Sequence, residues 1–390
     1  MDFNEFFSDR ARAIDTSGIR RIFHLGAHMD NPVNLSIGQP DFPVPDAIKR
    51  ATIDAIENDK NGYTLTQGID ELQSAIASHL MEDLGWDIPG GDASVLVTGG
   101  TSGALLLASL ATLGPGDEAI IPDPYFVLYP SLPVMCGAKA VLCDTYPDFR
   151  MTAERVEPLI TERTKYVLVC SPSNPCGVVN SRQECEDLLD LCRRKNVLLI
   201  SDEIYDEFTF PEFHDTEAGR KQSPSPARFP GANEDVLVVR GFGKTYGCTG
   251  WRMGYVAGPP ALVEQIAKMQ QYSFVCAPSI AQWGCVAAFG VDQTETVLRY
   301  EKRRDMVLDA LREHTTVATP GGAFYVYPEV PEALGITAQQ FVERGIEKNV
   351  LTIPGNVFSQ RDTHFRISYA TEESKLAKGI EILCDLLQGK

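Results

Sequence analysis

The sequence contains no apolar stretch that approaches the roughly 20 residues of a membrane-spanning helix. Residues 1–10 show no basic stretch followed by an apolar run, so no signal peptide is expected. The ten cysteines include no C-x-x-C pair, and the six histidines give no set of metal ligands, so no metal is expected. Such scattered cysteines are typical of reduced thiols in a cytoplasmic protein.

Basic residues are fewer than acidic residues, with 35 lysines and arginines compared with 53 aspartates and glutamates. The net charge of −18 makes nucleic acid and anionic membrane surfaces poor partners, so neither is expected. The remaining composition is that of a globular protein, with 44% hydrophobic residues. A chain of 390 residues is long enough for about two domains.

The middle of the chain alternates short apolar runs, bounded by Gly, Pro and Asp, with helical segments. This alternation predicts an α/β fold with a mostly parallel, seven-stranded sheet covered by helices on both faces. In such sheets ligands bind at the carboxyl ends of the strands. Strands are expected at 94–97, 118–121, 139–143, 166–170, 197–200, 236–239 and 256–257, and helices at 103–113, 153–160 and 182–195.

The pattern changes after about residue 290. A long amphipathic helix over 294–314 precedes a glycine-rich segment at 321–327, a short helix and two more strands, which indicates a smaller α+β domain. We expect residues 46–290 to form the large, cofactor-binding domain, and residues 1–45 and 291–390 the small one. The polar stretch 212–233, with Ser-Pro-Ser-Pro at 223–226, is expected to form a surface excursion between two strands.

Lys244 lies in the most informative segment, residues 236–255. There a buried strand runs into a glycine-rich turn that presents this lysine, and Arg252 follows eight residues later. A lysine at a strand end beside an anion-binding arginine suits an amine that bonds covalently to a phosphorylated aldehyde. A P-loop is excluded because position 238 is Val, and a dinucleotide fingerprint because Gly247 comes one position too late.

Two further segments carry candidates for binding an anion and a flat ring. A glycine-rich turn opens a helix within 98–105, and its free N–H groups favour a phosphate. An ordinary helix cap is the plainer reading of that turn. In residues 122–129, Phe126 is the first choice for stacking on a heteroaromatic ring and Tyr125 the second, with core packing equally compatible. The phosphate candidates are Gly100, Thr101 and Ser102.

Polar side chains follow three other apolar runs. Asn174 lies in a proline-flanked turn that aims its amide, although a purely structural turn has the same pattern. Asp202 directly follows a buried strand, where a carboxylate is costly unless it is paired, and a protonated ring nitrogen would pair with it. Tyr205 lies three residues further on. Arg366 could bind a substrate α-carboxylate through bonds worth roughly 1.5–3 kcal/mol each, or be an ordinary surface arginine.

These motifs occur in an order that resembles the class I/II pyridoxal-phosphate-dependent aminotransferases of fold type I, the aspartate aminotransferase superfamily. The matching segments are 37–42, 62–68, the Asn174 turn, Asp202-x-x-Tyr205, Lys244 with Arg252, and 365–368. The resemblance implies pyridoxal 5'-phosphate (PLP) as cofactor and a homodimer with active sites at the interface. It also implies that Tyr63 reaches the phosphate bound by the partner subunit and that Gly38 borders the substrate.

The resemblance further implies roles for the polar candidates. Lys244, Asp202 and Tyr205 would be catalytic, with Lys244 forming a Schiff base and Tyr205 hydrogen-bonding the phenolic oxygen of the cofactor. Asn174 would donate to the same oxygen and, with Arg366, border the substrate. Tyr325, Tyr327 and residues 17–21 are expected to form walls of the side-chain pocket.

The sequence departs from the family at two places. The family often has Ser-x-Ser-Lys at the Schiff base, and this chain has Gly241 and Gly243 in place of the serines, which moves phosphate binding onto Arg252, the 100–102 turn and Tyr63. Some aspartate-specific relatives carry a lysine in the glycine-rich turn, where this chain has Thr101 and Ser102. Strict aspartate specificity is therefore not predicted.

The expected function is transamination by a ping-pong route between an L-amino acid and a 2-oxo acid, in amino-acid metabolism and biosynthesis. The alternative on the same fold is a carbon–sulfur β-lyase or a related elimination enzyme. A cofactor-binding regulator is disfavoured because no helix-turn-helix domain or basic patch is present. A dehydrogenase is disfavoured because the glycine fingerprint is missing.

Overall fold

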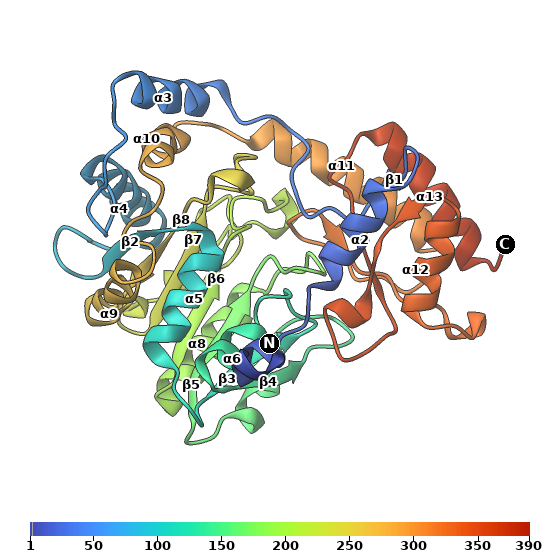
Figure 1. Cartoon of the computed structure of the whole chain (residues 1–390), viewed down its shortest axis with the longest axis horizontal. Helices are drawn as coiled ribbons and strands as arrows, with labels where there is room; N and C mark the ends of the chain where they lie inside the picture. Colours follow the sequence, from blue (N-terminus) through green and yellow to red (C-terminus); the bar gives the residue numbers. More distant parts are fainter. Residues whose placement is uncertain (2) are drawn as a thin grey trace.

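The computed structural model describes residues 1 and 3–390, without the side chains of Arg21, Phe23 and His24. A seven-stranded sheet forms its centre, with strand order β2-β8-β7-β6-β5-β3-β4 (Figure 1). Only β8 runs against the others, since it pairs antiparallel with both β2 and β7. The strands are β2 (Ser94–Thr98), β3 (Glu118–Asp123), β4 (Lys139–Asp144), β5 (Thr164–Cys170), β6 (Leu198–Asp202), β7 (Val236–Gly241) and β8 (Gly254–Gly258). The predicted mostly parallel, seven-stranded sheet is confirmed.

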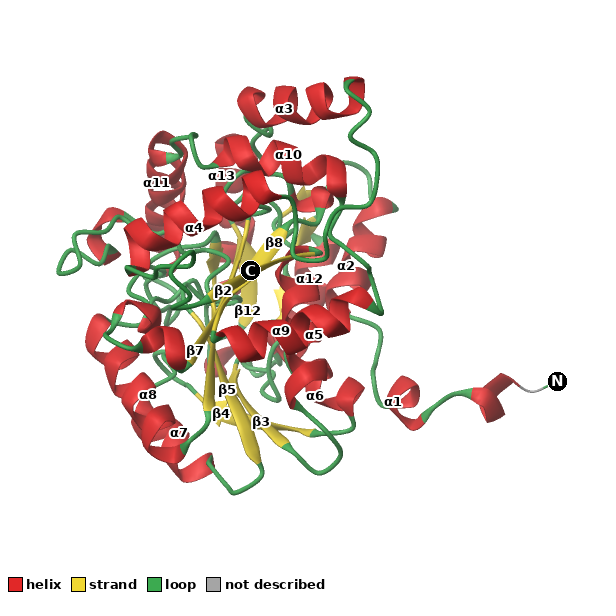
Figure 2. Ribbon diagram, turned by 90° about the vertical axis from the view of Figure 1, so that its left-hand side faces the viewer, coloured by secondary structure: helices red, strands yellow, loops and turns green. Residues whose placement is uncertain are grey.

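Helices cover both faces of this sheet, because successive side chains along each strand point to opposite sides. Val238 packs on one face with helices α4 (Asp70–Leu84), α8 (Arg182–Lys195) and α10 (Ser279–Ala288). Leu237 and Val239 pack on the other with α5 (Gly100–Thr112), α6 (Ser131–Cys136) and α9 (Pro260–Gln271). In Figure 2, α5, α6 and α9 lie to the right of the strands, with α8 and the short α7 (Ala153–Val156) to the left.

The smaller α+β part contains an antiparallel sheet of order β11-β12-β9. Its strands are β9 (Tyr325–Val326), β11 (Ile353–Pro354) and β12 (Phe365–Ser368), packed with α11 (Thr294–Leu311), α12 (Ala338–Glu347) and α13 (Glu373–Leu387). Near the amino terminus, α1 (Asp9–Arg12), α2 (Gly18–Ala27) and α3 (Asp46–Glu57) precede the large sheet, and β1 (Val33–Asn34) pairs in parallel with β10 (Val350–Leu351). The residue boundaries of the two domains stay a prediction.

Local sequence explains where individual helices begin and end. Helix α8 starts after Ser181, whose hydroxyl accepts from the Glu184 N–H while the Glu184 carboxylate accepts from the Ser181 N–H. It ends at Asn196 in the left-handed conformation. The helix predicted over 153–160 stops at Val156 and continues as a 3₁₀ turn containing Pro158, because proline lacks the N–H that would extend an α-helix.

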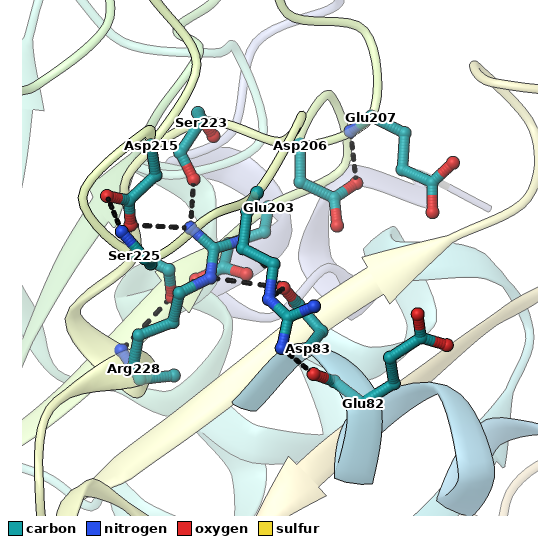
Figure 3. Close-up of polar contacts among 12 residues, drawn as sticks. Glu82, Asp83, Glu203, Asp206, Glu207, Asp215, Ser223, Ser225 and Arg228 are labelled. Atoms are coloured by element: carbon teal, nitrogen blue, oxygen red, sulfur yellow. Dashed lines mark hydrogen bonds and ion pairs between the residues drawn. The ribbon is translucent and has the colours of Figure 1, made fainter. Parts of the chain in front are cut away.

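The prediction of a surface excursion at 212–233 is wrong for residues 223–227. Residues 223–227 are buried, with Ser223 and Ser225 exposing 1% and 2% of their surface. The low hydrophobicity of this stretch does not make it exposed, because its polar groups form hydrogen bonds and ion pairs in the protein interior. The Ser225 hydroxyl donates to the Glu203 carboxylate at 2.6 Å, and Arg228 forms ion pairs with Asp83 and Asp215 (Figure 3).

The ten cysteines are free thiols, and most of them are buried. No helix in the described part of the chain combines the length and the apolar character needed to cross a membrane.

Candidate active site

A cavity of about 300 Å³ lies where β5, β6 and β7 end and α5 begins, with β12 on its other side. Eleven of the twelve residues predicted to be catalytic or to bind cofactor or substrate line it, and Tyr63 does not. The eleven are Gly38, Gly100, Thr101, Ser102, Phe126, Asn174, Asp202, Tyr205, Lys244, Arg252 and Arg366. Residues separated by more than 300 positions in the sequence thus surround one space at the strand ends, as expected for an open α/β sheet.

Lys244 follows β7 by three residues and points into this cavity. Its Nζ donates to the Gly38 carbonyl at 2.6 Å. Burial, together with the nearby charges of Arg366 and Arg252, lowers the pKa of Lys244 from 10.5 to about 7. A large fraction of this amine is therefore unprotonated and nucleophilic at neutral pH.

Asp202 is the last residue of β6 and is buried. Its Oδ2 accepts a hydrogen bond from the Tyr129 hydroxyl at 2.8 Å, and its Oδ1 accepts from the Ile204 N–H at 3.3 Å. Burial raises the pKa of Asp202 to about 6 despite these two bonds and the Lys244 charge. A cation placed against this carboxylate would favour its ionised form.

Tyr129 is a site residue that sequence reasoning missed. It lines the cavity beside Asp202 and packs edge-on against Phe126, with ring centroids 5.6 Å apart. The sequence offers one indication of this role, because Tyr129 lies three residues after Phe126 in the segment predicted to bind a ring. Phe126 lines the cavity and Tyr125 does not, so the structure favours the first choice for a stacking ring.

Tyr205 and Tyr325 meet on the wall of the cavity, with their hydroxyl oxygens 3.0 Å apart. Tyr325 also accounts for Gly38, because a Cβ at position 38 would lie 2.6 Å from the Tyr325 hydroxyl. Of the other predicted pocket walls, Ile19 lines the cavity, Tyr327 does not, and the side chain of Arg21 lies outside the described residues.

Arg366 is buried, with 1% of its surface exposed, so the surface-arginine reading is wrong. Its Nη1 donates to Asn174 Oδ1 at 3.0 Å and its Nη2 to the Ser36 carbonyl at 2.8 Å. The guanidinium lies between the rings of Tyr325 and Phe358, at 4.5 and 4.7 Å from their centroids. Among the described residues its buried Nε has no hydrogen-bond partner, so one donor of the guanidinium is unused.

The start of α5 is open to an anion. Its cap residue is Gly99, so no side chain caps the first N–H groups. Gly100 has φ +73°, and a Cβ there would lie 2.7 Å from Arg252 Nη2, so glycine is what lets the arginine approach the helix. Thr101 and Ser102 follow in the first turn. Free N–H groups, the helix dipole and one guanidinium together suit a phosphate.

Gly241 and Gly243, which stand where the family has serines, differ in the space that a side chain would have. A Cβ at Gly241 would lie 2.9 Å from Ile204 Cδ1 and 3.0 Å from Thr101 Cγ2. A Cβ at Gly243 would lie 3.2 Å from Thr249 Cα. Neighbouring side chains therefore already occupy the space around position 241, and a serine there would require Ile204 and Thr101 to shift.

Tyr63 lies outside the cavity, with 89% of its surface exposed. It borders a separate surface hollow whose wall includes Gly99, Arg252 and Phe274. Within one chain the structure therefore does not bring Tyr63 to the cavity, and its predicted role across a subunit interface stays a prediction.

Comparison with known proteins identifies the family. The profile described as "Aminotransferase class I and II" matches residues 30–383. An aspartate aminotransferase of Pyrococcus abyssi is 32% identical over 98% of each chain, and an aromatic-amino-acid aminotransferase of Thermococcus litoralis is 30% identical over 98% of each. The solved aspartate aminotransferase of Thermotoga maritima superimposes with a TM-score of 0.90 at 29% identity, covering 98% of this chain and 100% of that one.

The aspartate aminotransferase of Thermus thermophilus, solved with maleate, gives a TM-score of 0.88 at 31% identity over 97% of this chain and 99% of that one. The chain belongs to the class I and II aminotransferases. It is an aminotransferase with the α/β fold of the aspartate aminotransferases, as its sequence predicted.

Proposed function

We propose that this enzyme uses PLP to move an amino group between an L-amino acid and a 2-oxo acid by a ping-pong route, with Lys244 bonding covalently to the cofactor. The observation that carries the proposal is the convergence of Lys244, Asp202, Arg366 and the start of α5 on one cavity. A single amino acid should then convert the loaded enzyme once, and a 2-oxo acid should reverse that conversion.

The cavity residues fit the chemical groups of PLP. The amine of Lys244 matches the aldehyde, and the buried carboxylate of Asp202 matches a protonated pyridine nitrogen. Phe126 offers a ring to stack on, and Gly100, Thr101, Ser102 and Arg252 surround a place for the phosphate. Asn174 and Tyr205 also line the cavity, and their amide and hydroxyl groups would hydrogen-bond the phenolic oxygen.

When bound, PLP supplies an electron sink for the bonds of the substrate α-carbon. The protein supplies position and charge. The free amine of Lys244 is the base in the cavity that could take the proton from the substrate α-carbon and deliver it to the carbon that carried the PLP aldehyde. Arg366, held by Asn174 and Ser36, lines the cavity and would orient the α-carboxylate through its guanidinium. The Asp202 carboxylate would keep the ring nitrogen positive.

The depressed pKa of Lys244 predicts a pH dependence for covalent attachment of PLP. The neutral amine is the nucleophile, so its fraction, and with it the attachment rate, should rise through about pH 7 and level off above about pH 8. Mixing apoprotein with PLP over a series of pH values measures this rate. A midpoint near the ordinary lysine value of 10.5 would contradict the prediction.

Arg366→Lys should lower kcat/KM to a similar extent for every amino-acid substrate. Lysine keeps the charge but not the planar fork, so we expect kcat/KM to fall about 10- to 100-fold, the loss of roughly one charge-assisted hydrogen bond. Arg361→Lys is the matched control, because Arg361 is an exposed residue paired with Asp144. Equal kcat/KM values for the two variants would count against substrate binding by Arg366.

We further propose a homodimer with shared active sites. Tyr63 and Leu65 are 89% and 65% exposed and border one surface hollow, and a second copy of the chain that covered this hollow would bury both. Tyr63 would then contact the phosphate in the partner subunit.

We also propose that the chain divides into a large domain, 46–290, and a small one, 1–45 with 291–390. A cytoplasmic setting for the free thiols and a role in amino-acid biosynthesis belong to the same proposal.

A further inference from the structure

A buried ionic network lies on the α4 side of the sheet, where it includes Asp83 of α4 and Arg228 (Figure 3). Its centre is Arg240, a residue of β7 with 2% of its surface exposed. The Arg240 guanidinium donates to Glu203 Oε2 at 2.8 and 2.9 Å and to Asp83 Oδ2 at 2.7 Å. It also pairs with Asp206 Oδ2 at 3.1 Å.

The segment after β6 divides its side chains between this network and the cavity. Asp202, Ile204 and Tyr205 line the cavity, whereas Glu203 and Asp206 contact Arg240. One arginine therefore binds the reverse side of the segment that carries these three cavity residues. Arg240 also lies four residues before Lys244 on the same stretch of chain.

Glu203 has a second set of partners that fix its carboxylate. Its Oε1 accepts from Ser201 Oγ at 2.8 Å and from Ser225 Oγ at 2.6 Å. Arg240 donates to the other oxygen, Oε2, so both carboxylate oxygens have hydrogen-bond partners. The positive guanidinium also offsets the negative charge of Glu203. Without Arg240 it would be a buried negative charge directly next to Asp202 in the sequence, and that arrangement is costly.

We propose that Arg240 is a positioning residue for the cofactor site, which holds the Asp202–Tyr205 segment through Glu203 and offsets the Glu203 charge beside Asp202. This inference rests on the proposed PLP-dependent function. Asp202 is sensitive to such a change, because burial first and then the Glu203 charge already raise its pKa to about 6. An unbalanced Glu203 would push Asp202 further toward the neutral form, which cannot pair with a cationic ring nitrogen.

Arg228 provides a matched control inside the same network. It is equally buried, with 3% of its side chain exposed, and it pairs with Asp83 at 2.9 Å and Asp215 at 3.0 Å. Burial alone would raise the pKa of Asp83, but Arg240 and Arg228 outweigh it and lower that pKa to about 2. Within the described part of the chain, the Arg228 side chain contacts Asp83, Asp215 and the Ser223 carbonyl and makes no hydrogen bond or ion pair with Glu203. Loss of Arg228 should therefore lower stability and leave the cofactor site unchanged.

The experiment titrates PLP into apoprotein and measures its dissociation constant, with the melting temperature recorded alongside. Arg240→Met should weaken PLP binding about tenfold or more, the ratio that matches one pKa unit at Asp202. Arg228→Met should change it by less than about twofold although it also lowers the melting temperature. Equal losses of affinity in the two variants would overturn the proposal.

The double variant Glu203→Gln with Arg240→Met separates a charge effect from general damage. It removes the unbalanced carboxylate, so we expect the double variant to bind PLP at least about threefold more tightly than Arg240→Met alone. No recovery would overturn the proposed route through Glu203. Absence of PLP binding by the unmodified protein is a different result, since it would overturn the proposed function itself.

If Arg240→Met does not fold, two milder variants decide the question. Ser225→Ala removes a hydroxyl that donates to Glu203, and Ser223→Ala removes a neighbouring buried hydroxyl that donates instead to the Ser171 carbonyl. Ser225→Ala should weaken PLP binding about threefold relative to Ser223→Ala. Identical PLP affinities would overturn the proposal.

Discussion

Lys244→Ala is expected to abolish covalent attachment of PLP and to lower turnover by about 10⁴-fold or more. The variant loses the nucleophile for the aldehyde and also the base nearest the substrate α-carbon, and loss of acid–base catalysis alone is worth about 10²–10⁴-fold. Asp202, Arg366 and the start of α5 remain, so PLP should still bind without a covalent bond. Borohydride reduction followed by peptide mass analysis measures the attachment, and steady-state assays measure the turnover.

The control for this variant is Lys268→Ala. Lys268 lies on α9 with 49% of its side chain exposed and pairs with Glu264. It should keep both covalent attachment and turnover. A PLP adduct on any lysine of the Lys244→Ala protein, with turnover preserved, would contradict the assignment of Lys244.

Asp202→Asn should lower kcat/KM by about 10²–10⁴-fold. The amide keeps the shape and can keep the Tyr129 contact, but it carries no charge to hold a ring nitrogen in its protonated form. Removing one partner of a buried ion pair costs about 3–5 kcal/mol, which corresponds to this range. We expect the PLP affinity to fall as well, and both quantities come from titration and steady-state kinetics.

Asp215→Asn controls for the loss of a buried carboxylate. Asp215 exposes 2% of its surface and pairs with Arg182 and Arg228, away from the cavity. This substitution should lower the melting temperature with little change in kcat/KM. If Asp202→Asn and Asp215→Asn reduced kcat/KM equally, the effect would be structural and the role of Asp202 would be refuted.

The fold and much of the site follow from local sequence patterns. Each of the seven strands contains an apolar run, and Asp202 and Lys244 stand at or just after the ends of two of them. Parallel strands place their carboxyl ends at one edge, so order in the sequence predicts proximity in space. Arg366 was recognisable as a candidate from its strand-like surroundings, although its complete burial was not.

What the sequence did not reveal depends on contacts between distant segments. Tyr129 joins the site only because α6 and its preceding turn bring it against Asp202, 73 positions later. The burial of residues 223–227 depends on Glu203 and Asp83 meeting the Ser225 and Arg228 side chains. Polar residues carry no local sign of such pairing, so the pattern of a polar, proline-rich stretch predicts a surface segment.

The most direct test of the account is a titration of the PLP-loaded enzyme with single amino acids in the absence of any 2-oxo acid, with oxo acid and ammonia measured. We predict that an effective amino acid changes the absorbance of the bound cofactor and releases one equivalent of its own 2-oxo acid per site, without ammonia. Added 2-oxo acid should restore the original spectrum. Continuous release of ammonia and pyruvate would instead identify an elimination enzyme, and no spectral change with any amino acid would contradict PLP-dependent transamination.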